Sequence, residues 1–258
     1  MQLNYKKYGE NNAQNLLILH GLFGMLDNWQ YLARAWSDTV NVYALDLRNH
    51  GKSPHLLEMD YYLMAEDIIA FVEENALQNV SILGHSMGGK VAMQAAVSAP
   101  ELFEKLIVVD IAPKDYPSGH DDVFKALFAV NLVEIQSRNA VGAILAAEGL
   151  DDTTVQFFLK NLYRTGQATY DWRFNLPIIY ENYAHIIANS LTPYDTFEKA
   201  VLFIKGGNSP RYIEMEDLPL IAHYFPNYRL EVIPNAGHWV NADQPEVLEK
   251  AVREFLAN

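Results

Sequence analysis

Short, uninterrupted apolar runs that end abruptly in Gly, His or Asp constrain the fold of this chain more than any other feature. They are rich in Val, Ile and Leu, and segments with apolar residues at helical spacing lie between them. Such runs are typical of strands buried on both faces of a parallel sheet. The alternation therefore predicts an α/β fold with a mostly parallel, doubly wound sheet. The expected strands cover residues 15–20, 40–46, 80–84, 105–110, 201–205 and 230–233, and the expected helices 62–75, 89–98 and 245–256.

One interval is far longer than a crossover helix requires, the stretch from Asp110 to Val201. Its apolar spacing predicts helices throughout, and it is rich in Phe, Tyr and Trp. We expect a helical cap over residues 113–195, inserted between two late strands of a core made of residues 1–112 and 196–258. The helices expected in the cap cover residues 122–130, 134–148, 153–163 and 177–188.

Composition narrows the classes of partner. The formal net charge of −13 disfavours binding to nucleic acid or to an anionic membrane surface. The absence of cysteine excludes disulfides, cysteine-based metal sites and a cysteine nucleophile. No apolar run is long enough to span a bilayer, and no secretory signal follows Met1. We expect a cytoplasmic protein, monomeric by default, with no cofactor and no metal.

The strongest chemical motif is Gly84-His85-Ser86-Met87-Gly88, which lies between an expected strand and an expected helix. A G-x-S-x-G pattern in this context is typical of a nucleophile elbow, where a tight turn exposes the serine and glycines relieve crowding. Gly84 to Lys90 also fits the start of a phosphate-binding loop. That alternative is disfavoured because Val91 stands where a Ser or Thr would bind magnesium.

A serine nucleophile needs a base and an oxyanion hole. His238 is the candidate base, because Ala236-Gly237-His238 follows the last expected strand. The expected oxyanion donors are the N–H groups of Met87, directly after the nucleophile, and of Leu22 in the loop His20-Gly21-Leu22-Phe23-Gly24. The N–H of Phe23 is the alternative to that of Leu22. His20 is expected to brace the loop without transferring a proton.

These motifs, in this order and with the loop from Asp46 to Ser53, resemble the α/β-hydrolase family over nearly the whole chain. The resemblance is closest to its YbfF-type esterases, which are associated with short esters and acyl-CoA thioesters. In most of the family the orienting acid follows the strand matched by residues 201–205, but Ser209 stands there, and Glu214 and Glu216 lie further on. Some members carry the acid after the preceding strand. The resemblance therefore implies Asp110 as the acid.

The expected activity is hydrolysis of a small carboxylic ester or acyl thioester, including acyl-CoA, through an acyl-enzyme. Two alternatives stay open: a carbon–carbon bond hydrolase or lyase on the same scaffold, and a non-catalytic ligand-binding protein. Phe23, His85 and Trp239 are the expected pocket residues. Asp46 and Arg48 are expected to be structural, and Asp243 to cap the last helix. Candidate cations for a CoA substrate are Lys114, Lys125, Arg138, Lys160 and Arg164.

Overall fold

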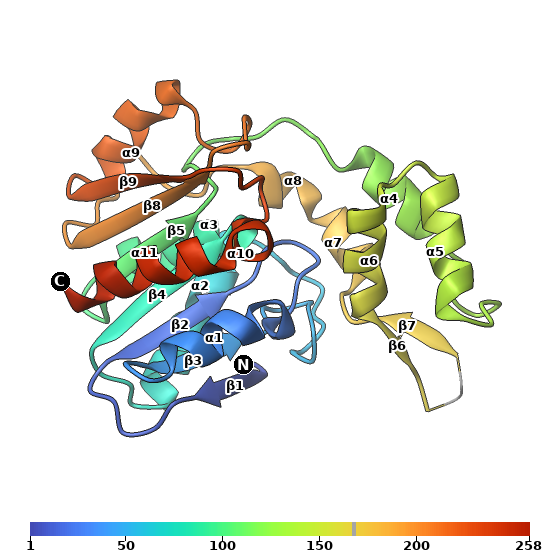
Figure 1. Cartoon of the computed structure of the whole chain (residues 1–258), viewed down its shortest axis with the longest axis horizontal. Helices are drawn as coiled ribbons and strands as arrows, with labels where there is room; N and C mark the ends of the chain where they lie inside the picture. The colour runs from blue at the N-terminus through green and yellow to red at the C-terminus, as the bar shows by residue number, and fades with distance from the viewer. Residues whose placement is uncertain (167–168) are drawn as a thin grey trace.

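A seven-stranded sheet forms the centre of the computed structural model, which describes residues 1–166 and 169–258. The strand order is β1-β3-β2-β4-β5-β8-β9, and every pairing is parallel except that of β1 with β3. This arrangement confirms the expected fold class (Figure 1). The strands are β1 (Tyr5–Tyr8), β2 (Asn15–Leu19), β3 (Asn41–Leu45), β4 (Val80–His85), β5 (Phe103–Val109), β8 (Ala200–Gly206) and β9 (Tyr228–Ile233).

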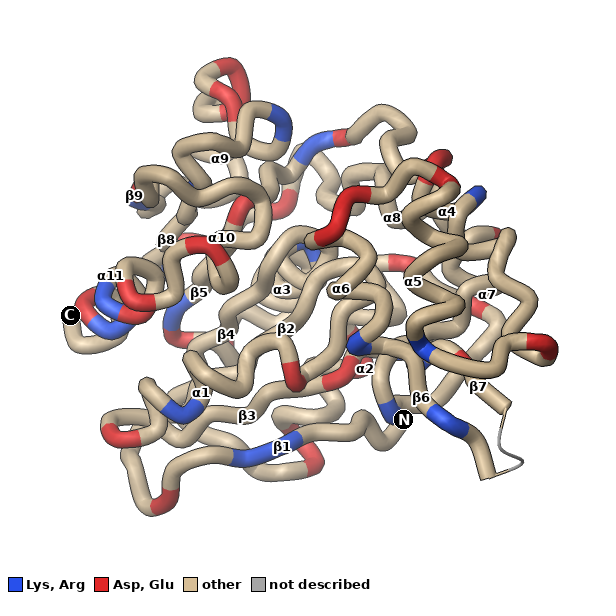
Figure 2. The backbone as a smooth tube through the Cα atoms, turned by 45° about the vertical axis from the view of Figure 1, so that its right-hand side comes forward, with Lys and Arg blue, Asp and Glu red and all other residues tan. Residues whose placement is uncertain are grey.

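The edge strand β1 is the element of this sheet that sequence analysis does not predict. Three of its four side chains are exposed, so it has no apolar run. Its two consecutive lysines, Lys6 and Lys7, colour β1 blue in Figure 2. Charged side chains on an edge strand oppose pairing with another chain.

Two apolar layers cover the sheet. Along β2, Leu16 and Ile18 belong to one buried cluster, whereas Leu17 and Leu19 belong to the other. Burial on both faces explains why the strands are apolar without alternation. Helices α2 (Tyr61–Glu74) and α3 (Met87–Ser98) pack together on one face, and α1 (Gln30–Trp36) and α11 (Pro245–Ala257) pack together on the other. The core also contains α9 (Leu218–Tyr224), α10 (Val240–Asp243) and the short 3-10 helices η1 (Leu26–Trp29) and η2 (Met215–Asp217).

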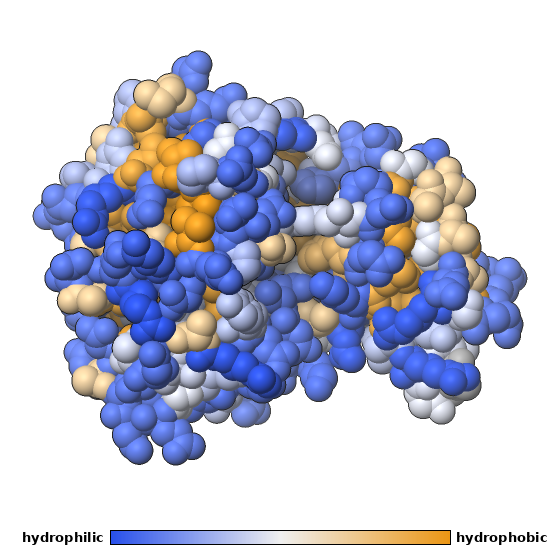
Figure 3. All heavy atoms as spheres, viewed as in Figure 1, coloured by the Kyte–Doolittle hydropathy of each residue, from blue (hydrophilic) through white to orange (hydrophobic). Residues whose placement is uncertain are grey.

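The segment expected to form the cap lies beside the sheet, at the right of Figure 1. Figure 3 shows a hollow between this part and the core. The cap holds a short hairpin that the helical expectation missed, because each of its strands has only three residues. The helix expected over residues 177–188 is divided at Asn182. The cap elements are α4 (Asp121–Phe128), α5 (Arg138–Ala147), α6 (Asp152–Asn161), β6 (Leu162–Arg164), β7 (Tyr170–Trp172), α7 (Leu176–Glu181) and α8 (Tyr183–Ile187).

The central strands end within two residues of one another. His85 pairs with Val109, Val109 pairs with Ile204, and Gly206 pairs with Ile233. The loops that follow β4, β5, β8 and β9 therefore leave the sheet at one edge, beyond the carboxyl ends of its strands, where α/β sheets bind ligands. Among the helices of the described ranges, none is long and apolar enough to cross a membrane.

Candidate active site

Ser86 stands at the turn between β4 and α3, in a strained backbone conformation with φ of +53° and ψ of −121°. Two glycines make this turn possible. A Cβ atom on Gly84 would overlap the Gly88 carbonyl, and one on Gly88 would lie 2.5 Å from the His20 carbonyl oxygen. A non-glycine residue at positive φ is uncommon and concentrates at functional sites, where surrounding structure holds the strain. Here the turn holds the Ser86 hydroxyl beyond the edge of the sheet.

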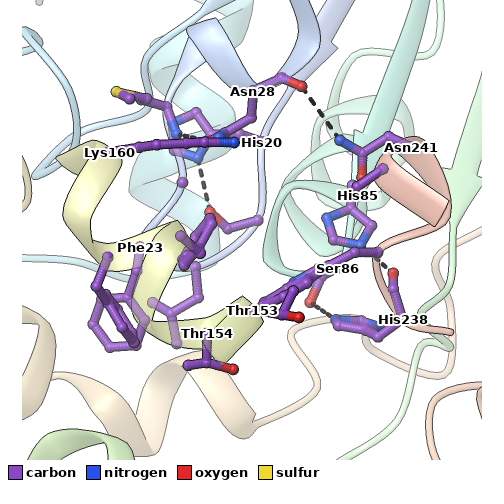
Figure 4. Close-up of a pocket in the computed structure, with 18 of the residues that line it drawn as sticks. His20, Phe23, Asn28, His85, Ser86, Thr153, Thr154, Lys160, His238 and Asn241 are labelled. Atoms are coloured by element: carbon purple, nitrogen blue, oxygen red, sulfur yellow. Dashed lines mark hydrogen bonds between the residues drawn. The ribbon is translucent and has the colours of Figure 1, made fainter. Parts of the chain in front are cut away.

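His238 joins Ser86 to Asp110. Its Nε2 lies 2.9 Å from Ser86 Oγ, and its Nδ1 lies 2.8 Å from Asp110 Oδ2 (Figure 4 shows the first of these contacts). Since an ionised carboxylate only accepts, Nδ1–H donates to Asp110 and Nε2 is free to accept the Ser86 proton. The three residues that sequence analysis selects for the chemistry thus form one continuous hydrogen-bonded chain.

Asp110 follows β5 and is fully buried. The Gly206 N–H donates to its Oδ1 at 2.9 Å, and the Ser209 hydroxyl donates to its Oδ2 at 2.5 Å. With His238, three donors surround the carboxylate, and hydrogen bonds of this kind are what stabilise a buried negative charge. Glu214, considered above as an alternative acid, forms an ion pair with Lys114 instead.

Two aromatic residues fix the His238 ring and backbone. The ring of Tyr212 stacks on that of His238, with centroids 3.6 Å apart and an interplanar angle of 16°. The His85 ring contacts the His238 carbonyl oxygen through Nε2 at 2.8 Å. Burial lowers the pKa of His85 to about 3, so it is neutral and its Nε2–H donates. Sequence analysis missed Tyr212; its only signal is its place in the loop after β8.

The loop opposite Ser86 is braced by two neutral histidines. The Phe23 N–H donates to His50 Nε2 at 3.1 Å, while His50 Nδ1–H donates to the Arg48 carbonyl at 2.9 Å. His20 likewise accepts from the Leu47 N–H through Nε2. Burial lowers the pKa of His50 to about 3 and that of His20 to about 4, so both retain an acceptor nitrogen at neutral pH.

The Phe23 N–H is therefore already occupied, and the Gly24 N–H turns back to the Gly21 carbonyl at 2.9 Å. Within residues 1–166 and 169–258 no acceptor takes the Leu22 N–H. Met87 is the first residue of α3, where backbone N–H groups have no partner inside the helix and carry partial positive charge. These two N–H groups remain available for a ligand.

A cavity of about 1070 Å³ lies over Ser86 and His238, between the core and the cap. Phe23, His85 and Trp239, the expected pocket residues, all line it. Phe23 is also nearly buried, and Trp239 stacks on Phe157 of α6. Figure 4 shows Thr153 and Thr154 of α6 at the same cavity. Core and cap both contribute walls to the site.

Asp46 and Arg48 make contacts that stabilise the fold. Asp46 accepts from the Leu26 and Lys52 N–H groups, and Arg48 forms a buried ion pair with Asp67, as the structural interpretation expects. The expectation for Asp243 is wrong. Gln244 is the residue before α11, and the Asp243 carboxylate instead accepts from the Gly237 N–H beside His238. In the part of the chain that the structure describes, no three His, Asp or Glu side chains are grouped to hold a metal ion.

Comparison with known proteins adds to this geometry. The sequence profile of the alpha/beta hydrolase fold matches residues 14–245. A putative esterase/lipase of Haemophilus influenzae is 42% identical, covering 98% of this chain and 88% of that protein. Esterase YbfF of Escherichia coli is 36% identical, covering 99% of both chains. The sn-1-specific diacylglycerol lipase ABHD11 of Mus musculus is 34% identical over 96% of this chain and 83% of its own length.

A solved structure agrees closely. The marine microorganism esterase superposes with a TM-score of 0.95 at 38% identity, covering 98% of this chain and 99% of its own.

Proposed function

The chain belongs to the α/β-hydrolase family, and from this premise we propose a serine hydrolase that cleaves carboxylic esters or acyl thioesters through an acyl-enzyme. The observation that carries the proposal is the unbroken hydrogen-bonded chain from Ser86 through His238 to Asp110. This arrangement meets the geometric requirement for an activated serine, a nucleophile that contacts a base held by a third group.

In the first half of the proposed reaction, Ser86 Oγ attacks the substrate carbonyl carbon while its proton passes to His238 Nε2. Asp110 holds the imidazole in the reactive tautomer and stabilises its positive charge. Collapse of the tetrahedral intermediate breaks the bond to the alcohol or thiol, which leaves with the proton from His238. In the second half, His238 Nε2 takes a proton from the water that attacks the acyl carbon. Collapse of the second tetrahedral intermediate breaks the bond to Ser86 Oγ, which regains the proton from His238 as the acid leaves.

The oxyanion of both intermediates is assigned to the N–H groups of Leu22 and Met87. The hydrogen bond from Phe23 to His50 supports Leu22 over Phe23. Each such donor contributes about 3 kcal/mol to transition-state stabilisation in known serine hydrolases. Neutral His50 is therefore part of the proposed oxyanion hole, because it holds the loop that presents Leu22.

The charge of the cavity favours an ester of an uncharged alcohol over a CoA thioester. Of the described residues that line it, Lys160 is the one cation, against the carboxylates of Asp27, Asp152 and Asp243. His20, His85 and His120 add no charge to the lining, since burial lowers the pKa of His20 and His120 to about 4 and that of His85 to about 3. Several phosphate groups would find little compensation there.

Three of the other cations considered for CoA have partners outside the cavity. Lys114 pairs with Asp217, and Lys125 pairs with Glu148. Arg138 donates to the carbonyl oxygens of Leu159 and Leu162. The apolar rings over the oxyanion loop suit an acyl chain, and the relatives named as esterases and lipases support an ester substrate.

The test is a hydrolysis panel with one variant. Wild-type protein should hydrolyse p-nitrophenyl acetate and butyrate with a higher kcat/KM than acetyl-CoA and butyryl-CoA. Ser86→Ala should lower turnover by at least about 10⁴-fold, as loss of the nucleophile does in such enzymes, and should abolish labelling by a fluorophosphonate. Ser98→Ala, at the exposed far end of the same helix, is the control. Undiminished hydrolysis by folded Ser86→Ala would overturn the proposal.

A further inference from the structure

Lys90 is a buried lysine that the proposed chemistry does not use. It lies four residues after Ser86 on α3, with 3% of its surface exposed. Its ammonium donates to the carbonyl oxygens of Lys114 at 2.8 Å, Ala188 at 2.8 Å and Ile187 at 3.3 Å. The sequence motif that suggested a phosphate-binding loop ends at this residue. Its three N–H donors are instead occupied by backbone carbonyls.

Those carbonyls belong to both connections between the core and the cap. Lys114 lies where the chain leaves β5 for the cap, while Ile187 and Ala188 lie where it returns. The Tyr116 N–H also donates to the Ile187 carbonyl, at 2.9 Å, so the two connections are tied to each other as well as to α3. A single side chain thus fastens both ends of the insertion to the helix that carries the nucleophile.

Aromatic rings complete the site around the ammonium. Lys90 Nζ lies 5.5 Å from the centre of the Tyr61 ring and 4.8 Å from that of Tyr116. Cation–π contacts of this kind stabilise a charge removed from water. The Tyr61 hydroxyl from α2 donates to the Ile186 carbonyl at 2.6 Å, which adds another tie to the returning connection.

The outgoing connection also contacts a residue that supports His238. The Tyr116 hydroxyl accepts from the Ala112 N–H at 2.8 Å, two residues after Asp110, and donates to the Tyr212 carbonyl at 2.5 Å. The Tyr212 ring is the one that stacks on His238. Displacing residues 112–116 would therefore disturb the support of both the acid and the base.

We infer that Lys90 is a positioning residue, which fastens both connections of the cap to the nucleophile helix and so holds the cap and Tyr212 in the arrangement that hydrolysis requires. The inference rests on the proposed function for its kinetic consequence, but the fastening itself is independent of it. Lys90 does not touch substrate in this arrangement.

The protonation state of Lys90 gives the fastening a pH dependence. Burial lowers its pKa to about 7, while the Asp115 carboxylate acts in the opposite direction. The other titratable groups around it are Tyr61 from α2, and Lys114 and Tyr116 from the outgoing connection; the returning connection presents carbonyls. In an opened and hydrated connection the Lys90 amine has its ordinary pKa of 10.5, so the closed arrangement binds a proton less tightly than the opened one. The free energy of opening these connections should therefore rise as pH increases through about 7.

The test compares Lys90→Met with Lys105→Met. Lys105 is a matched control because its ammonium also donates to two backbone carbonyls, those of Phe255 and Leu256, on α11 and away from the cap. Amide hydrogen exchange of residues 112–118 and 186–191 and steady-state kinetics on p-nitrophenyl butyrate are measured for both. Lys90→Met should lose protection in these segments and at least tenfold in kcat/KM, whereas Lys105→Met should change neither.

The pH dependence of hydrogen-exchange protection provides a second test. After correction for intrinsic exchange, protection of residues 112–118 and 186–191 should rise as pH increases from 6 to 8, and Lys90→Arg should abolish that dependence. Equal protection of these segments in Lys90→Met and wild type, or equal kinetic losses in Lys90→Met and Lys105→Met, would overturn the inference. So would protection in wild type that is independent of pH. If Ser86→Ala retained activity, the proposed function would fail, while the exchange arms would still test the fastening.

Discussion

Asp110 and Ser209 meet at the ends of neighbouring strands. Ser209 occupies the loop after β8 where most α/β-hydrolases carry the acid, and its hydroxyl donates to the same Asp110 oxygen that contacts His238. Because Val109 and Ile204 pair directly, the ends of β5 and β8 lie within two residues of each other, and either strand can bring a carboxylate to His238 Nδ1. The carboxylate must lie beside His238 Nδ1, and a residue after either β5 or β8 can place it there.

This geometry leads to a residue-scale prediction. Asp110→Asn should lower kcat by about 10⁴-fold, because the amide no longer fixes the reactive imidazole tautomer. Adding Ser209→Asp to that variant should restore at least a tenfold part of the loss. Ser209→Ala alone should cost about tenfold, the effect of one hydrogen bond to a charged group. Steady-state kinetics on p-nitrophenyl butyrate give kcat for wild type and for the three variants. Full activity of Asp110→Asn would remove Asp110 from the proposed reaction.

The residues that sequence analysis identified differ from those it missed in how local their signals are. Gly84, Ser86 and Gly88 specify a turn within five positions, and His238 lies in the short loop after a strand. Tyr212 and Lys90 act on partners that only the tertiary fold brings near, so no short pattern marks them. Lys90 lies at the end of a sequence pattern that is typical of a phosphate-binding loop.

At the scale of elements, the strands that sequence analysis predicts also differ from those it misses in how strong their local signal is. The six parallel strands were predictable because burial on both faces requires continuous apolar residues. Strands β1, β6 and β7 lie at an edge or in a small hairpin, and their short, partly exposed sequences carry no such signal. The cap helices were expected as a group, but their ends depend on local caps such as Ser137, which accepts from the Ala140 N–H at the start of α5.

Phe23, in the loop of residues 20–24, contacts three aromatic residues of the expected cap. Its ring packs edge-on against Phe124, Phe158 and Phe174, with centroids 5.0 to 5.6 Å apart. Phe23→Ala should lower the free energy of unfolding by about 3 kcal/mol, the usual cost of removing a buried phenyl ring. Urea denaturation gives this value. Phe128→Ala, in the cap but 49% exposed, is the control and should cost less than about 1 kcal/mol. Equal losses in the two variants would contradict this assignment.

At the scale of the whole molecule, four histidines make stability depend on pH: His20, His50 and His85 are buried, and His120 is half-buried. Burial lowers the pKa of His20 and His120 to about 4 and that of His50 and His85 to about 3, against 6.5 for a free side chain. These residues lie around the site where the core meets the cap. Each stays neutral in the folded state over a pH range in which it becomes charged on unfolding.

Proton binding by these histidines determines how the free energy of unfolding changes with pH. Below pH 6.5 the unfolded chain binds protons that the folded protein does not, so the free energy of unfolding should be highest above pH 6.5. It should then fall as pH drops toward 4, by up to about 1.4 kcal/mol per pH unit for each histidine. Urea denaturation at pH 7, 6 and 5 measures this slope. His50→Gln keeps an acceptor for the Phe23 N–H and should have a shallower slope, whereas His185→Gln, exposed on α8, should match wild type. A free energy of unfolding that is constant from pH 7 to 5 would show that these histidines take up protons without unfolding.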